Sequence, residues 1–286
     1  MYVGKVIRDI RISKNIPSNK VYKNILSRPA IAKFEKGLSD TTVEKFFEII
    51  NVLNITLEEF EVIYKNDGNK DLLYTRKYIE AYYNKNVAAL KQITFDAKRD
   101  YLVTGNEKFR HYQALVSLLI DDLNGTNEYR EELDVIQNYL MNCNSWGYYE
   151  VTLFTNTLSF YSNELIDLVY SRAKNTLLML KNIKRYRNEV ALMLFNILEI
   201  KIVSKNVNSA KFYLTELNKI KLDVVDNMYI QAMIKYFTAI LNLIDGKYQD
   251  DTVLNITEMF DFLGLVSKKD QCFSFYNKVK TLYSIA

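Results

Sequence analysis

The feature that most constrains the fold is a helical pattern that recurs every forty residues in the C-terminal part of the chain. Blocks with the apolar spacing of an amphipathic helix cover residues 145–161, 185–201 and 225–241. Two partner blocks, 206–220 and 246–262, keep the same interval. One helix pair cannot bury its apolar face alone, so the recurring pair predicts an α-solenoid of the tetratricopeptide kind, although the strict consensus of those repeats is absent.

Earlier blocks with helical spacing extend this array toward the N-terminus. They cover 71–84 with 86–102, and 107–123 with 127–142, which brings the prediction to five helix pairs. The composition agrees with this pattern, because 286 residues include only eight Gly and two Pro. Sheets joined by tight turns need more of both residues. The predicted fold class is therefore all-α.

Other features argue against membrane proteins, secreted proteins and enzymes. No run of eighteen apolar residues occurs and the N-terminus lacks a signal-peptide layout, so we expect a cytoplasmic protein without a membrane span. Cys143 and Cys272 are too few for a disulfide framework and are read as ordinary thiols. The single His111 has no metal-binding partner at a usable spacing, and no phosphate loop or nucleophile elbow occurs. We expect no catalysis, no cofactor and no metal site.

Positive charge is concentrated at the N-terminus. Residues 1–36 contain nine Lys or Arg against two acidic residues, a net charge of +7. Residues 37–65 contain two basic and six acidic residues, a net charge of −4, so the rest of the chain contributes +1 to the total of +4. This distribution is typical of a nucleic-acid-binding head.

Short amphipathic helices are predicted within this head from apolar spacing, caps and breaks. They cover 3–14, 19–23 after the cap Ser18, 27–37, a fourth helix opened by Ser39 or Asp40, and a fifth opened by the capping box of Thr56 and Glu59. The inward stripe predicted for the fourth helix is Val43, Phe46, Phe47, Ile50 and Leu53. Short helices with the second and third closely joined predict a helix-turn-helix domain.

The third of these helices has the properties of a DNA-recognition helix. Ile31 and Phe34 lie three residues apart and share a buried face, while Arg28, Lys33 and Lys36 project outward. A short basic helix held by its apolar back among other helices suits the DNA major groove.

Several strings carry a resemblance to a known family. In the head they are Gly4-Lys5 with Arg8 and Arg11, Ser27-Arg28-Pro29 with Lys33-Phe34-Glu35-Lys36-Gly37, Ser39-Asp40 with Val43-Glu44-Lys45, and Leu53-Asn54-Ile55-Thr56-Leu57-Glu58-Glu59-Phe60. In the body they are Ser145-Trp146-Gly147-Tyr148-Tyr149-Glu150 with Leu153-Phe154 and Asn156, and Asp261-Phe262-Leu263-Gly264-Leu265. With them the chain resembles the Rgg/GadR/MutR regulators, which have a phage-repressor-type (XRE) helix-turn-helix head. The resemblance implies a quorum-sensing transcription factor that responds to a short hydrophobic peptide. It also implies a homodimer, joined largely through the body, that binds an inverted-repeat promoter site on double-stranded DNA.

Candidate DNA-binding residues follow from their positions in this head. The groove-facing candidates are Ser27, Arg28, Ala30 and Lys33, of which Arg28 and Lys33 suit guanine or phosphate acceptors. The candidates for phosphates or the groove edge are Lys5, Arg8, Asn19, Lys20 and Lys36. By resemblance, Arg11 and Glu35 are expected to form a structural ion pair, with direct DNA contact as the alternative.

Candidate peptide-binding residues lie on the predicted inner helices. Asn156 and Asn196 are forty residues apart, and their amides could satisfy a peptide backbone as a clamp. Phe154, Tyr229 and Tyr236 could form the walls around apolar side chains. The alternative is that the asparagines only bond across helix joints and that the aromatics belong to the core.

The sequence therefore predicts a helix-turn-helix domain over 1–65, a linker over 66–70 and a tetratricopeptide-like repeat domain over 71–286 that senses the peptide and dimerises. Two other functions stay open at this point. One is a helical-repeat module that binds a protein partner and carries a vestigial head. The other is a regulator whose effector is not a peptide, or which has no effector.

Overall fold

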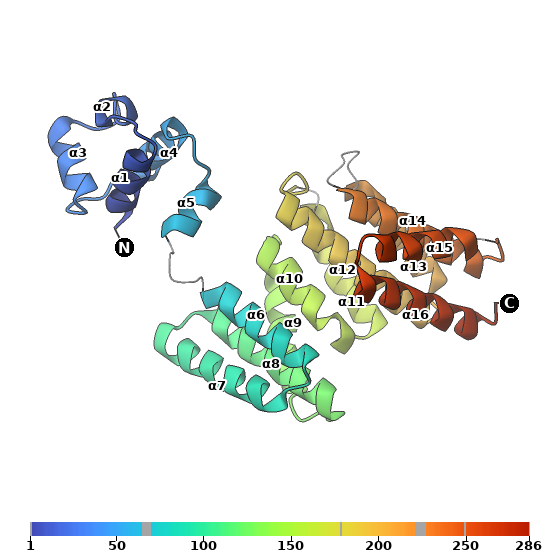
Figure 1. The fold of residues 1–286 in the computed structure, drawn as a ribbon. Coiled ribbons are helices and arrows are strands. Elements are labelled where there is room, and N and C mark those ends of the chain that lie inside the picture. Colours follow the sequence, from blue (N-terminus) through green and yellow to red (C-terminus); the bar gives the residue numbers. More distant parts are fainter. Residues whose placement is uncertain (1, 65–69, 178, 221–226, 249, 286) are drawn as a thin grey trace. The chain divides into compact units, whose positions relative to one another are not determined.

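Residues 2–64, 70–177, 179–220, 227–248 and 250–285 are described in the computed structural model, with the backbone alone for 70–73. Every element in these ranges is helical, which confirms the all-α class (Figure 1). The chain divides into two compact units, Met1–Glu80 and Ala81–Ala286, and this division falls within α6 (Lys70–Tyr83). The predicted linker lies outside the described residues except for Lys70, so the domain limits stay predictions.

The first unit contains a bundle of short helices built around one apolar core. Its helices are α1 (Val3–Ser13), α2 (Ser18–Val21), α3 (Arg28–Glu35), α4 (Val43–Val52) and α5 (Leu57–Tyr64). Ile7, Val21, Phe34, Ile49 and Leu53 are almost completely buried in this core. Helices of this length are marginal in isolation, so the shared core is what holds them in place.

The start of α4 corrects the sequence prediction. The helix begins at Val43, and its cap is Thr42, whose hydroxyl accepts a hydrogen bond from the Lys45 amide at 3.4 Å. The helix therefore starts later than Ser39 or Asp40 would have placed it. Val43 and Phe47 are exposed, so both were wrongly assigned to the inward stripe. The buried face of α4 is therefore narrower than the predicted stripe.

The predicted capping box at the start of α5 is present. The Glu59 amide donates to the Thr56 hydroxyl at 3.1 Å, and the Thr56 amide donates to the Glu59 carboxylate at 2.6 Å. These bonds satisfy backbone donors that the first turn of a helix leaves unpaired.

Two glycines allow α1 and the end of α3 to pack closely. A methyl group on Gly4 would lie 1.8 Å from the carbonyl oxygen of Phe34, so a larger residue cannot fit without displacing backbone. Gly37 ends α3 with φ +73°, and its amide donates to the same Phe34 carbonyl at 2.8 Å. The Leu38 amide bonds the Lys33 carbonyl at 2.9 Å, which completes a Schellman turn.

The second unit consists of helices that follow one another along the chain. The predicted helical blocks correspond to α6, which the division between the units crosses, and to α7 (Val87–Thr104), α8 (Glu107–Asn124), α9 (Glu131–Asn142), α10 (Tyr148–Thr157), α11 (Asn163–Leu177), α12 (Lys184–Val203), α13 (Val207–Ile220), α14 (Met228–Ile244) and α15 (Asp250–Phe262). Of the predicted pairs, α8 packs against α9, α12 against α13 and α14 against α15. A short 3-10 turn (Leu158–Phe160) follows α10, and α16 (Val266–Tyr283) follows the last pair. Successive pairs stack, because α10 packs against α12, α12 against α14, and α14 against α16.

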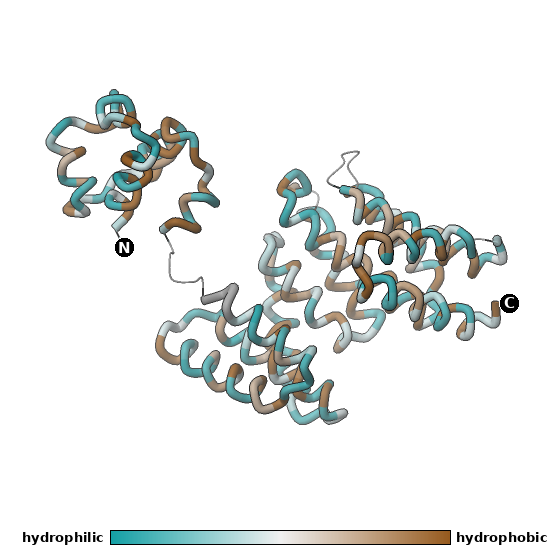
Figure 2. Tube along the Cα trace, viewed as in Figure 1, coloured by the Kyte–Doolittle hydropathy of each residue, from teal (hydrophilic) through white to brown (hydrophobic). Residues whose placement is uncertain are grey.

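The central helices of this stack are buried on several sides. Met193 and Ile197 of α12 are completely buried, as are Phe237 and Ile240 of α14. Apolar segments recur along these helices, drawn in brown in Figure 2. Within the described residues, no helix combines the length and the apolar character that crossing a bilayer requires.

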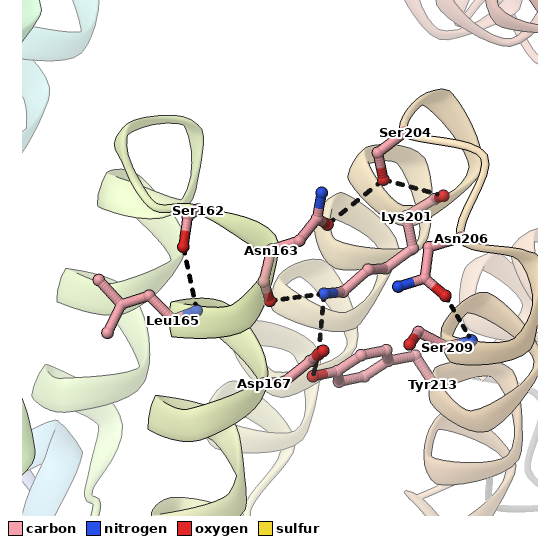
Figure 3. Close-up of polar contacts among 9 residues, drawn as sticks. All are labelled: Ser162, Asn163, Leu165, Asp167, Lys201, Ser204, Asn206, Ser209 and Tyr213. Carbon is pink, nitrogen blue, oxygen red and sulfur yellow. Dashed lines mark hydrogen bonds and ion pairs between the residues drawn. The ribbon is translucent and has the colours of Figure 1, made fainter.

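A buried lysine locks three helices of the stack together (Figure 3). Lys201 of α12 is fully buried, and its ammonium group donates to the Asn163 carbonyl at 2.7 Å and lies 2.8 Å from the Asp167 carboxylate. The Tyr213 hydroxyl of α13 donates to the same carboxylate at 2.7 Å. A buried charge is tolerated only when its partners are well placed, so these bonds fix the register of α11, α12 and α13.

His111 joins the second and third helix pairs. The imidazole of α8 is only 3% exposed, its Nδ1 lies 2.7 Å from the Tyr149 hydroxyl of α10, and its ring centroid is 4.3 Å from that of Tyr139 in α9. Burial lowers the pKa of His111 below its usual value. Smaller electrostatic effects come from Glu107 and Glu150, which raise the pKa, and from Arg110, which lowers it. This joint therefore favours the neutral form of the His111 imidazole.

This joint predicts that the body loses stability in mild acid. The unfolded chain has a histidine pKa of about 6.5, so it binds more protons than the folded chain below that pH. The stabilising contribution is present above the unfolded pKa and is lost as the pH falls through the lower folded-state pKa. His111→Gln, which keeps a polar group beside Tyr149, should reduce the pH dependence of the unfolding free energy. Urea titrations at about pH 7.5 and about pH 5, followed by fluorescence of the single Trp146, measure it. If the unfolding free energies of the wild type and His111→Gln depended equally on pH, His111 would not be the group responsible.

Candidate functional site

The predicted recognition helix presents one face outward. Ser27, Arg28 and Lys33 are exposed, while Phe34 on the opposite face is only 1% exposed and Ile31 is half-buried. The helix runs from Arg28, with Ser27 at the cap position and Pro29 in the first turn, where the fixed φ of proline is tolerated. The basic side chains at its start are therefore accessible to a ligand.

A polar bracket holds the other end of this helix. Arg11 of α1 binds the Glu35 carboxylate with two hydrogen bonds, Nε to Oε1 at 2.7 Å and Nη2 to Oε2 at 3.0 Å. The Tyr22 hydroxyl, from the turn after α2, donates to Glu35 Oε1 at 2.7 Å. Burial opposes ionisation of Glu35, but the bonds from Arg11 and Tyr22 outweigh it and hold the pKa of the carboxyl below its usual value.

The sequence indicated one part of this bracket and missed the other. The ion pair between Arg11 and Glu35 had been expected from the resemblance. Tyr22 had not been singled out, because no local pattern relates its hydroxyl to a carboxylate thirteen residues away. Through Tyr22, the bracket adds the turn after α2 to the support of α3.

The other predicted DNA residues occupy different positions around α3. Those that are exposed are Lys5, Arg8, Asn19, Lys20 and Lys36. Ala30 is half-buried. The exposed side chains are accessible to a ligand.

An open cavity lies between α3 and the segment that leads into α4. Its volume is about 590 Å³, and its lining is Leu26, Pro29, Ala30, Lys33, Ser39, Asp40, Thr41, Thr42 and Lys45. Lys45 and the first amides of α4 were not predicted as site residues. Lys33 and Lys45 supply two positive charges against the single carboxylate of Asp40, a balance that suits a DNA phosphate.

Two of the predicted peptide-binding residues lie in the core. Phe154 is completely buried, with its ring 5.3 Å from Trp146 and 5.7 Å from Tyr161. Tyr236 is 1% exposed and its hydroxyl donates to the Cys272 carbonyl at 2.6 Å. Both side chains face neighbouring helices, so neither can form the wall of a surface site in this structure.

The other three residues reach the surface of the stack. Asn156 of α10 and Asn196 of α12 are half-buried, on helices that pack against each other. Leu192, one turn before Asn196, is exposed. Tyr229 at the start of α14 is also exposed, and its ring lies 6.0 Å from Phe195 and 5.9 Å from the Lys268 ammonium group. We call Asn156, Leu192, Asn196 and Tyr229 the amide face.

A separate polar cavity of about 360 Å³ occurs in the body. Its lining is Leu118, Asp121, Asp122, Gly125, Thr126, Asn127, Arg130, Leu133, Ser159 and Phe160. The Asp121 carboxylate already accepts bonds from Thr126, Glu128 and Tyr129, so it serves the turn between α8 and α9. Among the described residues, no cluster of three or more His, Cys, Asp or Glu side chains is placed to hold a metal ion.

A helix-turn-helix head with an exposed basic helix, followed by stacked helix pairs, defines a DNA-binding regulator of transcription. The family described as "HTH-type transcriptional regulator Rgg, C-terminal domain" matches residues 96–274, and a helix-turn-helix family matches residues 7–60. The chain belongs to the Rgg family of helix-turn-helix transcriptional regulators, which confirms the resemblance noted in the sequence. The family consists of DNA-binding regulators and not of enzymes.

Solved structures share this fold along nearly the whole chain. A candidate transcriptional regulator from Listeria monocytogenes EGD-e is 20% identical, with a TM-score of 0.88 over 99% of both chains. The Streptococcus dysgalactiae SHP pheromone receptor Rgg2 is 20% identical, with a TM-score of 0.79 over 96% of this chain and 99% of that chain. PrgX in its complex with cCF10 is 16% identical, with a TM-score of 0.76 over the same shares.

The bracket predicts that Glu35 supports DNA binding without touching DNA. Glu35→Gln weakens the charge-assisted bonds from Arg11 and Tyr22, which should cost the head about 2 kcal/mol of stability. Hydrogen exchange at the α3 amides of the full chain should become faster, and DNA affinity should fall. Glu48→Gln, at an exposed position of α4, is the matched control. Unchanged exchange at α3 would show that the bracket is dispensable.

The exposed start of α3 predicts sequence-specific contacts. Arg28→Ala and Lys33→Ala should each weaken binding to a preferred duplex by about tenfold to about a hundredfold, the cost of about 1–3 kcal/mol for a base contact. The preferred duplex can be selected from random sequences and the affinities measured by fluorescence anisotropy at several salt concentrations. Lys91→Ala, an exposed lysine of the body, is the control. Wild-type DNA affinity in a variant that carries both Arg28→Ala and Lys33→Ala would refute the assignment of these residues to DNA contacts.

Proposed function

We propose that this protein is a transcription regulator whose promoter binding is controlled by a short hydrophobic peptide bound at the amide face. The observation that carries the proposal is the pair Asn156 and Asn196, half-buried on helices that pack against each other. An asparagine side chain offers both donors and an acceptor, so two of them can satisfy the backbone of an extended peptide. Leu192 and Tyr229 supply apolar surface for peptide side chains.

The electrostatics near this face favour a ligand of low charge. Glu199, one turn beyond Asn196, is half-buried. Burial raises the pKa of its carboxyl, and Lys268 and Lys278 oppose that shift. Charges of both signs are therefore already present in this region. The relatives add support, since Rgg2 is described as an SHP pheromone receptor and PrgX was solved with cCF10.

We assign DNA binding to the head as a homodimer on an inverted-repeat site. The proposed contacts are Arg8, Asn19, Lys20, Ser27, Arg28, Ala30, Lys33 and Lys36. A two-fold symmetric protein places two recognition helices in successive major grooves, so an inverted repeat mirrors its symmetry. Such a regulator acts in the cytoplasm, where the chromosome is.

The proposed control is a shift between two arrangements of the dimer. A peptide changes promoter binding only if it binds one arrangement more tightly than the other. Tight peptide binding alone would leave the two arrangements in their original ratio.

Calorimetric titration with short peptides encoded beside the gene, and promoter binding measured in parallel, tests this function. The variant with Asn156→Ala and Asn196→Ala should bind the active peptide about tenfold or more weakly, because each lost hydrogen bond costs about 1 kcal/mol. Asn208→Ala, at an exposed position of α13, is the control.

Each alternative gives a different result in these titrations. Wild-type peptide affinity in the variant with both asparagines changed would rule out the asparagine clamp. The assignment as a transcription regulator would still stand. Selective DNA binding without response to any peptide would favour another effector. Absence of salt-dependent, sequence-selective DNA binding would favour a protein-interaction module with a vestigial head.

A further inference from the structure

The polar cavity of the body has the size and lining of a site for a small ligand. Three segments meet around it: the end of α8, the turn that leads into α9, and the 3-10 turn after α10. Its volume of about 360 Å³ lies near the lower end of the range of about 300–1,000 Å³ that is typical of small-molecule sites. None of the four residues of the amide face lines it, so it is a different site from the one proposed for the peptide.

The turn between α8 and α9 holds its part of the wall in a defined conformation. The Asp121 carboxylate is only 5% exposed, and it accepts hydrogen bonds from the Thr126 hydroxyl at 2.6 Å and the Tyr129 amide at 2.7 Å. Gly125 ends α8 with φ +67°, and the Thr126 amide donates to the Asp121 carbonyl at 3.0 Å. The hydrogen-bonding capacity of Asp121 is therefore used within the turn, and a wall formed in advance lowers the entropic cost of binding a ligand.

Other polar side chains of the lining are available to a ligand. Asn127, Arg130 and Ser159 are exposed, and their side chains form no hydrogen bond or ion pair with any residue that the structure describes. Asp122 is exposed as well, and one of its carboxylate oxygens accepts the Tyr82 hydroxyl. It has no cationic partner within the described ranges. The cavity therefore offers an unpaired guanidinium and an unpaired carboxylate.

These two charges select the class of ligand. A phosphate or another simple anion would meet the carboxylates of Asp121 and Asp122 against the single guanidinium of Arg130. A metal ion would be repelled by that guanidinium. A zwitterion can place its carboxylate beside Arg130 and its ammonium group beside Asp122, so it matches both charges with charge-assisted hydrogen bonds.

The apolar part of the lining defines the rest of the ligand. Leu118 and Leu133 are 3% and 7% exposed, and Phe160 is half-buried. Together they form an apolar wall for a small side chain. Asn127 and Ser159 add a neutral amide and a hydroxyl, each of which can bond either charged group of a zwitterion. A cavity of this size suits one amino acid better than a peptide of several residues.

We propose that this cavity binds a free α-amino acid with an apolar side chain. Arg130 binds the α-carboxylate, and Asp122 accepts hydrogen bonds from the α-ammonium group. The side chain of the amino acid packs against Leu118, Leu133 and Phe160. The inference does not rest on the proposed peptide site, because the two sites share no residue.

Thermal unfolding of the full chain with each common α-amino acid in turn, followed by Trp146 fluorescence, tests the proposal. A ligand that binds only the folded chain raises the melting temperature, so apolar amino acids should raise it, whereas aspartate and lysine should not. Calorimetry then gives the affinity of the strongest binder. Its amide lacks the carboxylate and its deaminated acid lacks the ammonium group, so each should bind the wild type about tenfold or more weakly.

Substitutions at the two charged residues locate the site. Arg130→Gln and Asp122→Asn each remove one charge and keep a polar side chain, so each should weaken amino acid binding by about tenfold or more. Lys98→Gln and Asp270→Asn, at exposed positions of α7 and α16, are the matched controls and should keep wild-type affinity. The two ligand analogues are tested on the wild-type chain, so their result does not depend on how the variants fold.

Several results would overturn the inference. One is a melting temperature that no amino acid changes, and another is wild-type amino acid affinity in both Arg130→Gln and Asp122→Asn. Binding of inorganic phosphate but of no amino acid, lost in Arg130→Gln, would instead assign the cavity to anions. Binding of Ca²⁺ but of no amino acid, lost in Asp122→Asn, would assign it to cations. Peptide titrations measure the amide face separately, so the failure of either proposal leaves the other standing.

Discussion

Glu35 ties the proposed recognition helix to two other segments of the head. The eight residues of α3 are too few to be stable alone, so their position comes from neighbours. The main tethers act near the C-terminal end, where Phe34 fills the core, Gly4 lets α1 approach, and Glu35 binds Arg11 and Tyr22. In helix-turn-helix proteins the N-terminal residues of this helix contact base edges. The tethers therefore fix α3 at its C-terminal end and leave exposed the N-terminal end that we propose contacts DNA.

In the body, tyrosine hydroxyls hold the stacked helices in register. Apolar faces alone would let stacked helices slide, whereas a hydrogen bond fixes a register. The chain has 22 tyrosines, and many of their hydroxyls cross helix joints. Examples are Tyr213 to Asp167, Tyr170 to Glu216, Tyr186 to the Trp146 carbonyl and Tyr236 to the Cys272 carbonyl. Tyr236 had been predicted to form a wall of the peptide site. Its hydroxyl, like those of Tyr170, Tyr186 and Tyr213, instead holds neighbouring segments of the stack together.

Local patterns predicted the elements well and their faces less well. The capping box of Thr56 and Glu59 needs only residues three apart, and it is present as predicted. Val43 and Phe47 have helical spacing with the core residues of α4, yet the core does not extend far enough to cover them. Phe154 and Tyr236 were misplaced for the opposite reason. Helices in the middle of a stack are covered on several sides, and Phe154 and Tyr236 lie on sides that neighbouring helices cover, whereas Tyr229 of α14 does not.

The sequence by itself determined the helical class, the repeating pairs, the basic head and the family. Those properties depend on residues a few positions apart, on composition and on short strings, all of which can be read along the chain. Only the tertiary structure decided that Tyr22 joins the Arg11–Glu35 pair, that Lys201 is buried among three helices, and that Phe262 is left uncovered. Each of these depends on helices distant in sequence, and the free energy of their packing is not encoded in any local pattern.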